Sequence, residues 1–123
     1  MHDHKIGTLV VCNASKHPVG IITDRDLAVR IVAAGRDPNI TVIAEVMTES
    51  PTVICEDASI ESALSHMRAG PFRRLPVVNK KGVMVGMISL DDILSLLTKE
   101  FYDIGGLLNR ENPASLSVPY VMR

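Results

Sequence analysis

No stretch of this 123-residue sequence is apolar enough to cross a membrane, because a spanning helix needs ~18–20 uninterrupted apolar residues. The first residues, Met1-His2-Asp3-His4-Lys5, lack the apolar run of a signal peptide. Cysteine is also scarce: Cys12 and Cys55 each lie in an apolar run, which predicts two buried free thiols rather than a disulfide. These absences predict a cytoplasmic protein with no membrane partner.

Net charge and catalytic motifs are lacking as well. The formal charge is −1, whereas a protein that binds nucleic acid generally has a basic surface, so we do not expect nucleic acid as a partner. There is no nucleophile elbow, no Walker loop and no Cys/His spacing for a metal, so we expect no enzyme and no catalytic cofactor. One basic cluster lies in mid-chain, either as a solvated surface or as a site for a small phosphorylated ligand: Arg68, Arg73, Arg74, Lys80 and Lys81.

What the sequence does contain is an internal repeat. With 46% hydrophobic and 22% charged residues the chain is globular, and an offset of 66 residues aligns Ile6–Leu27 with Phe72–Ile93 without a gap. Both copies end in Gly-x-x-hydroxyl-x-x-Asp, which indicates a true duplication. The identities pair Leu9, Val11, Asn13, Val19, Gly20, Ile22 and Asp26 with Leu75, Val77, Asn79, Val85, Gly86, Ile88 and Asp92.

The second copy predicts a complete β-α-β-β-α unit, because apolar periods of two and of 3.6 residues follow one another between turn residues. It begins with a strand, Thr52–Cys55, and a helix capped by Ser59, whose apolar face consists of Ile60, Ala63, Leu64 and Met67. Two antiparallel strands follow, Leu75–Val78 and Val83–Ile88. The last element is a helix from Ser89 to about Ile104, whose apolar face consists of Leu90, Ile93, Leu94 and Leu97.

The first copy carries only the second half of this unit. Its elements are strands Thr8–Cys12 and Val19–Ile22 and a helix from Thr23, with Leu27, Ala28, Ile31 and Val32 facing inward. Because Met1 aligns with Met67, the counterpart of Val46–His66 is expected before the chain's start. That missing strand and helix would cover an apolar surface of the first repeat, and we expect a partner subunit to cover this surface instead. We divide the chain into a partial repeat with its linker (1–43), a full repeat (44–106) and a tail (107–123) that is a flexible end or a docking arm.

This order of motifs resembles the cystathionine-β-synthase (CBS) domain family over residues 1–98. Val46-Met47-Thr48, Pro51-Thr52-Val53, an amphipathic helix, Arg73-Arg74-Leu75-Pro76-Val77-Val78-Asn79 and Gly86-Met-Ile-Ser-Leu-Asp-Asp92 follow one another as in a complete CBS domain. The resemblance implies an α/β (α+β) fold of two repeats with small mixed three-stranded sheets. It also implies a homodimer that binds AMP, ADP, ATP or another adenosyl ligand between the repeats, and regulates a protein that is not identified.

The resemblance also implies roles for particular residues. Thr23 with Asp26, and Ser89 with Asp92, would hold a ribose, although both pairs also fit a capping box that satisfies the N–H groups of a helix start. Arg73 and Arg74 would hold a phosphate, with Arg74 and Asp26 as the preferred combination. The first repeat has Gly7 and Thr8 at the positions of these arginines, so the two clefts are expected to be unequal.

The base would lie against apolar residues near the strands, for which Ile22, Thr48, Thr52 and Val53 are candidates by resemblance. Aliphatic residues of strands are more often buried for packing alone. Two other functions stay open from the sequence: an interaction module that dimerises without a ligand, and a regulatory piece of a larger enzyme.

Overall fold

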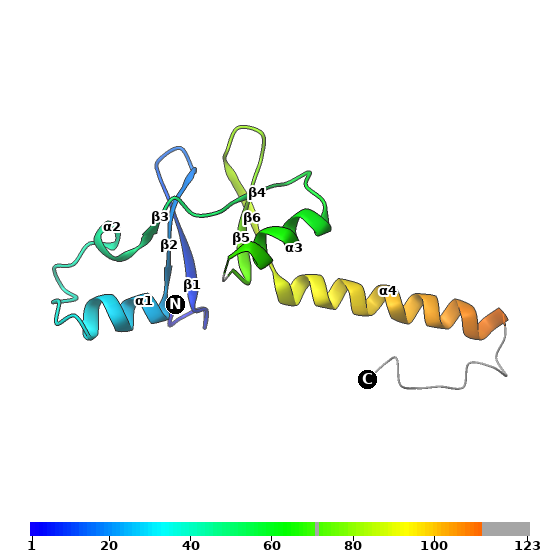
Figure 1. Ribbon diagram of the computed structural model, residues 1–123. Helices are drawn as coiled ribbons and strands as arrows, with labels where there is room; N and C mark the ends of the chain where they lie inside the picture. The colour runs from blue at the N-terminus through cyan, green and yellow to red at the C-terminus, as the bar shows by residue number, and fades with distance from the viewer. Residues whose placement is uncertain (71, 112–123) are drawn as a thin grey trace.

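The chain forms two small sheets of three strands each. The computed structural model describes residues 1–70 and 72–111. The first sheet contains β1 (Thr8–Cys12), β2 (Pro18–Thr23) and β3 (Thr48–Glu49) in that order. The second sheet contains β4 (Ile54–Cys55), β5 (Arg74–Val78) and β6 (Met84–Ser89). In Figure 1 the two sheets stand side by side, each with its hairpin loop at the top.

Helices follow or precede these strands. The first sheet leads into α1 (Asp24–Leu27), which continues as a π-helical turn, η1 (Ala28–Val32), and α2 (Ile43–Val46) precedes β3. The second sheet is joined to α3 (Ile60–Ala69) and α4 (Leu90–Glu111). None of the helices in the described residues has the length and apolar character that crossing a membrane requires.

The two hairpins repeat each other residue for residue. β1 and β5, and β2 and β6, have bounds that differ by the 66 residues seen in the sequence. Both hairpins are antiparallel, as predicted, and pair in the same register, with an irregularity after Val11 in one and after Val77 in the other. The duplication is therefore confirmed at the level of backbone pairing.

The repeated asparagines hold the hairpin turns. Asn13 Oδ1 accepts a hydrogen bond from His17 N at 3.0 Å, and Asn79 Oδ1 accepts one from Val83 N at 3.0 Å. In each turn one residue adopts a left-handed backbone conformation: Lys16 with φ 63° in the first hairpin and Gly82 with φ 78° in the second. The identity of Asn13 and Asn79 thus has a structural cause.

The third strand distinguishes the sheets. β4 pairs parallel with β5, which makes the second sheet mixed, whereas β3 pairs antiparallel with β2 at the opposite edge of the first sheet. Within residues 1–70 and 72–111, no strand pairs with the other edge of β1. Leu75 on β5 is only 1% exposed, while its repeat counterpart Leu9 on β1 is 39% exposed.

Each repeat has its own core. Ile54, Ala63, Met67, Leu75 and Ile93 form the core of the second repeat, and Ile22, Ile31 and Val46 form that of the first. The predicted inner face of α3 is confirmed, since Ala63 and Met67 are buried and Ile60 and Leu64 pack beside them.

Several expectations about burial and length were wrong. Ala28 is exposed and Val32 is 77% exposed, because the helix from Thr23 widens into a π-helical turn, and within the described residues Leu27 and Ile31 are its members of the first core. Cys12 is a free thiol, as predicted, but lies exposed at the end of β1.

The helix expected to end near Ile104 continues to Glu111, through Gly105 and Gly106. Glycine weakens a helix by about 1 kcal/mol per residue, which the long run of helix-forming residues on both sides outweighs. The part of the predicted tail from residue 112 on lies outside the described residues.

The repeats contact each other at their hairpin ends. Met84 N donates to Lys16 O at 2.9 Å, and the imidazole Nε2 of His17 lies 3.0 Å from Lys81 O. The chain passes from the first sheet to the second between Ser50 and Val53 (Figure 1). These contacts fix the repeats next to each other, so that a space between them can act as a site.

Gly20 offers a test of the first core. A Cβ at Gly20 would lie 2.9 Å from Met47 Cγ and also meet Met47 Sδ, whereas one at the repeat counterpart Gly86 would meet nothing within 4 Å. We expect Gly20→Ala to lower the free energy of unfolding by about 1–3 kcal/mol through overpacking. Gly86→Ala should leave it unchanged or raise it slightly. Urea denaturation followed by circular dichroism measures both, and equal losses would contradict this packing.

Candidate functional site

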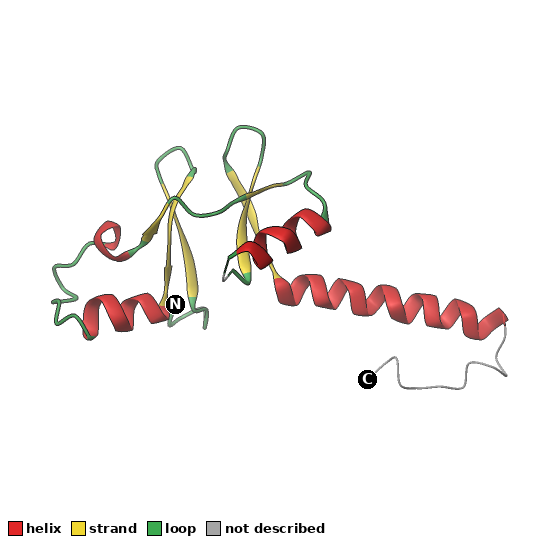
Figure 2. Ribbon diagram, in the orientation of Figure 1, coloured by secondary structure: helices red, strands yellow, loops and turns green. Residues whose placement is uncertain are grey.

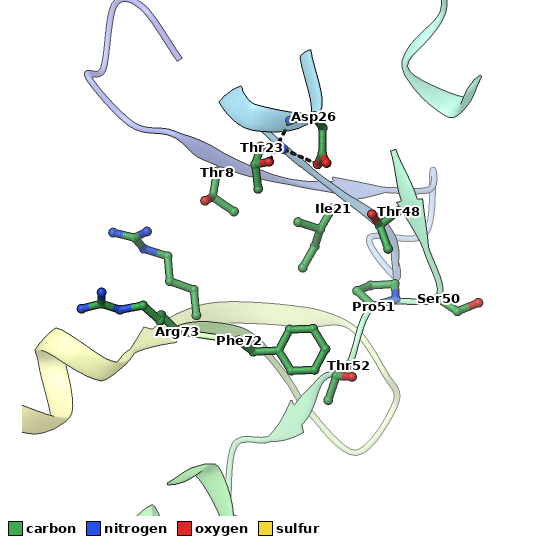
Figure 3. Close-up of a pocket in the computed structure, with 11 residues that line it drawn as sticks. Thr8, Ile21, Thr23, Asp26, Thr48, Ser50, Pro51, Thr52, Phe72 and Arg73 are labelled. Carbon is green, nitrogen blue, oxygen red and sulfur yellow. Dashed lines mark hydrogen bonds between the residues drawn. The ribbon is translucent and has the colours of Figure 1, made fainter. Parts of the chain in front are cut away.

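A cleft of about 480 Å³ lies between the two repeats. This volume falls within the ~300–1,000 Å³ of small-molecule sites. Its lining comes from both sheets and from the chain that joins them, and consists of Thr8, Ile21, Thr23, Asp26, Thr48, Ser50, Pro51, Thr52, Phe72, Arg73 and Arg74. Figure 3 shows the first repeat and the second facing each other across this space.

Thr23 and Asp26 lie where β2 meets α1, and they cap each other. Asp26 N donates to Thr23 Oγ1 at 3.1 Å, and Thr23 N donates to Asp26 Oδ2 at 2.8 Å (Figure 3). The capping box proposed from the sequence is therefore present, and it fixes both side chains at the cleft.

The capping leaves part of Asp26 free for a ligand. Oδ2 accepts the hydrogen bond from Thr23 N, while Oδ1 has, among the residues that the structure describes, only the Arg30 guanidinium as a partner, at 3.7 Å. The Asp26 side chain is 18% exposed. A carboxylate held in this way can accept hydrogen bonds from hydroxyl groups of a ligand in the cleft.

Arg30 connects the Asp26 carboxylate to the segment of the first repeat that contains Val46 and Thr48. Its Nη1 donates to Val46 O at 2.8 Å and its Nη2 donates to Thr48 Oγ1 at 3.2 Å. Arg30 is thereby held beside Asp26 and Thr48, which keeps the first repeat's side of the cleft in one arrangement.

The opposite wall carries the two arginines at the start of β5. Arg73 forms an exposed ion pair with Asp91, with Nη2 and Oδ1 3.4 Å apart. In the part of the chain that the structure describes, Arg74 has no acidic partner within salt-bridge distance. The cleft thus has a carboxylate on one repeat and an unpaired guanidinium on the other.

Apolar side chains complete the cleft. Ile21, Pro51 and Phe72 line it together with the hydroxyl groups of four threonines. In Figure 3 Ile21 and Phe72 come from opposite repeats and both reach into the space. A flat, partly apolar ligand can lie between two such side chains.

Not all of the predicted site residues line this cleft. Ser89 and Asp92 form the same capping box at α4, with Asp92 N to Ser89 Oγ at 3.1 Å, but they lie outside the cleft. Ile22 is 2% exposed in the first core, and Val53 is not in the lining either. The structure thus shows the capping box at Ser89 and Asp92, and a ribose-binding role for these two residues stays a prediction.

Five lining residues were not anticipated. Successive residues of a strand face opposite sides, so the burial of Ile22 places Ile21 toward the cleft. Thr8 is the repeat counterpart of Arg74, and this alignment could have identified it. Pro51 belongs to the Pro51-Thr52-Val53 motif but was not predicted as a site residue, and Ser50 and Phe72 carry no sequence signal of their own. Ser50 and Pro51 line the cleft because the chain crosses between the sheets there.

The model of the CBS domain family matches residues 1–33 and 43–99. The chain therefore belongs to the CBS domain family. The two matched stretches together contain all six strands described above. The resemblance seen in the motifs is confirmed.

Several curated proteins are similar to the chain. YlbB of Bacillus subtilis is 39% identical over 102 residues, which cover 81% of this chain and 68% of that protein. Hypoxic response protein 1 of Mycobacterium tuberculosis is 34% identical over 93 residues, which cover 76% of this chain and 64% of that protein. A protein of Methanopyrus kandleri, MK0525, is 33% identical over 96 residues, 78% of this chain and 49% of that protein. The chain thus spans about half to two thirds of the length of these relatives.

Solved structures have the same architecture. Hypoxic Response Protein I, solved with two coordinated zinc ions, has a TM-score of 0.70 and 33% identity, covering 77% of this chain and 76% of that one. The CBS domain pair of protein MJ0100, solved in complex with 5′-methylthioadenosine and S-adenosyl-L-methionine, has a TM-score of 0.66 and 28% identity, covering 78% and 76%. The predicted fold class, a mixed α/β pair of CBS domains, is confirmed.

Proposed function

We propose that this chain is a regulatory module, not an enzyme, which binds an adenosine nucleotide or another adenosyl ligand between its repeats. The observation that carries the proposal is that one cleft is lined by the half-buried Asp26 of one repeat and by Arg74 of the other, which has no acidic partner within the described residues. Asp26 and Thr23 would hold the ribose hydroxyls, and Arg74, assisted by Arg73, the phosphate of AMP, ADP or ATP. Thr48 and Thr52 would add hydroxyl contacts.

The base would lie between Ile21 and Phe72. An adenine ring is flat, and apolar contact on both faces removes it from water while its edge bonds backbone groups. The similarity to the MJ0100 pair, whose ligands are both adenosine derivatives, supports this class of ligand.

Regulation would follow from the position of the ligand between two repeats. A ligand that binds one relative arrangement of the repeats better shifts the population toward that arrangement. A coupling of ~1–3 kcal/mol is enough to change a partner's affinity severalfold to a hundredfold. The regulated protein, the cytoplasmic setting and the division at residues 43 and 106 remain predictions.

Isothermal titration of adenosine, AMP and ATP into the purified chain tests the proposal. We expect saturable binding, and we expect Arg74→Gln to weaken AMP about tenfold or more while leaving adenosine unchanged, because a lost charge-assisted contact costs about 1.5–3 kcal/mol. Lys80→Gln is the matched control, since it removes the same charge from the basic cluster but outside the cleft.

Two outcomes would contradict this assignment. An equal loss of AMP affinity in both variants would mean that only the overall charge attracts the ligand. If neither these ligands nor S-adenosylmethionine binds the folded chain, the ligand-free interaction module becomes the better function.

A further inference from the structure

The two repeats differ in the residue that stands four positions after the capping aspartate. In the first repeat this residue is Arg30, and its counterpart at the 66-residue offset is Leu96 in the second repeat. The capping boxes that precede them make the same two hydrogen bonds, at Asp26 and at Asp92. The duplication therefore isolates one difference next to two equivalent carboxylates.

The helix that carries Arg30 also differs in shape from its counterpart. Ala33 N donates to Ala28 O, five residues back, at 2.8 Å, so the helix contains the π-helical turn η1 with Arg30 at its centre. The counterpart stretch, residues 94–98, is α-helical within α4. Single π-helical turns inside α-helices occur frequently at functional sites. A difference of sequence and a difference of backbone thus fall at the same place.

Arg30 reaches from this helix to the segment that leads into β3. In Figure 2 the helix that starts with α1 and the short α2 lie on the same side of the first sheet. Arg30 Nη1 donates at 2.8 Å to the carbonyl of Val46, the last residue of α2, and Nη2 donates to Thr48 Oγ1 at 3.2 Å. The same Nη2 lies 3.7 Å from Asp26 Oδ1. One guanidinium therefore holds a threonine of the cleft and faces its carboxylate.

The guanidinium gives the Asp26 carboxylate a second point of restraint. Thr23 N fixes Oδ2, but the last torsion of an aspartate side chain is broad, so one hydrogen bond leaves the carboxylate room to rotate. At 3.7 Å from Oδ1 the guanidinium attracts this oxygen without a hydrogen bond, which leaves it able to accept from a ligand. Among the described residues, no cationic group lies within salt-bridge distance of Asp92. Asp26 is thus held ready for a ligand in a way that Asp92 is not.

We propose that Arg30 is the positioning residue that makes Asp26, rather than Asp92, the ribose-binding carboxylate of the chain. The inference rests on the proposed nucleotide function and adds to it the residue that decides which copy of the duplication binds. Arg30 is not among the residues that line the cleft, so it acts through Asp26 and Thr48. Groups that are already ordered before binding lose less conformational freedom when the ligand arrives.

Isothermal titration of AMP and of 2′,3′-dideoxy-AMP, which lacks the ribose hydroxyl groups, tests the role of Arg30. Arg30→Leu introduces the side chain that the second repeat has at this position. We expect it to raise the Kd for AMP by about threefold to tenfold, which corresponds to the ordering of one side chain. The Kd for the dideoxy analogue should not change. An equal loss for both ligands would mean that only the shape of the cleft suffers, and would overturn the inference.

Arg36→Leu is the matched control. The Arg36 side chain is 46% exposed, against 42% for Arg30, and it pairs with Glu45 at 3.1 Å in the same repeat but outside the cleft. Its substitution should leave the Kd of both ligands unchanged, and a loss equal to that in Arg30→Leu would overturn the inference.

Arg30→Lys is a second variant at the same position. It keeps the positive charge but lacks the planar fork that reaches Val46 O and Thr48 Oγ1 together. We expect it to weaken AMP in the same direction by a smaller factor. Wild-type affinity in both Arg30 variants would overturn the inference.

A double-mutant cycle shows whether Arg30 acts through Asp26. If it does, Arg30→Leu combined with Asp26→Asn should weaken AMP about as much as Asp26→Asn alone. Independent, additive losses would overturn the inference but leave the nucleotide function standing. Absence of AMP binding by a wild-type chain that circular dichroism shows to be folded would remove both.

Discussion

Asp26→Asn is expected to weaken AMP binding roughly tenfold to a hundredfold, because hydrogen bonds to a charged group contribute about 1.5–3 kcal/mol each. Asparagine keeps one oxygen that can accept from Thr23 N, so the cap of α1 survives. It replaces the other carboxylate oxygen, the one available to a ribose hydroxyl, with an amide that donates. Isothermal titration of AMP into both proteins measures the change.

Asp92→Asn is the control that the duplication provides. Asp92 occupies the same position of the same capping box, with Oδ2 accepting from Ser89 N at 3.1 Å, but lies outside the cleft. Its substitution should leave AMP affinity unchanged. If Asp92→Asn abolished binding and Asp26→Asn did not, the nucleotide site would have to be moved to the other end of the duplication.

Leu75→Ala should lower the free energy of unfolding by about 2–5 kcal/mol, which is the cost of removing a buried leucine side chain and leaving a cavity. Leu75 is 1% exposed and packs in one core with Ile54, Ala63 and Met67. Because a small domain is stable by only about 5–15 kcal/mol, this loss is a large share of the total. Urea denaturation at one fixed protein concentration measures it, since pairing of two copies would make stability depend on concentration.

Leu9→Ala is the matched variant in the first repeat. Leu9 occupies the same register position, opposite Ile22 as Leu75 is opposite Ile88, yet 39% of it is exposed. A side chain already in contact with water loses less on truncation, so we expect less than half of the effect at Leu75. Equal losses would mean that Leu9 is covered in solution, for example by a second copy.

Much of the fold could be predicted from local sequence. Hairpin bounds, the antiparallel pairing and the caps at Thr23, Ser59 and Ser89 all depend on residues within a few positions of each other. The length of α4 could not be read in this way, because Gly105 and Gly106 signal a helix end although the helix continues through them.

Much less of the candidate site could be predicted. The sequence offered two ribose positions, Asp26 and Asp92, and preferred Asp26 only through its combination with Arg74. It also offered two aliphatic candidates, Ile22 and Val53, with nothing local to rank them. Ile21 and Phe72 had no motif at all, and they line the cleft because two segments far apart in the chain face each other.

The sequence by itself determined that the chain is a duplication of the CBS type, since repeated residues impose the same local hydrogen bonds in both copies. Only the tertiary structure decided which copy does what. Leu9 and Leu75, or Asp26 and Asp92, have the same neighbours along the chain and the same backbone pairing, yet they differ in exposure and in access to the cleft. The physical reason is that burial depends on the segments packed against a residue, and α3 and β4 pack on one sheet while β3 joins the other.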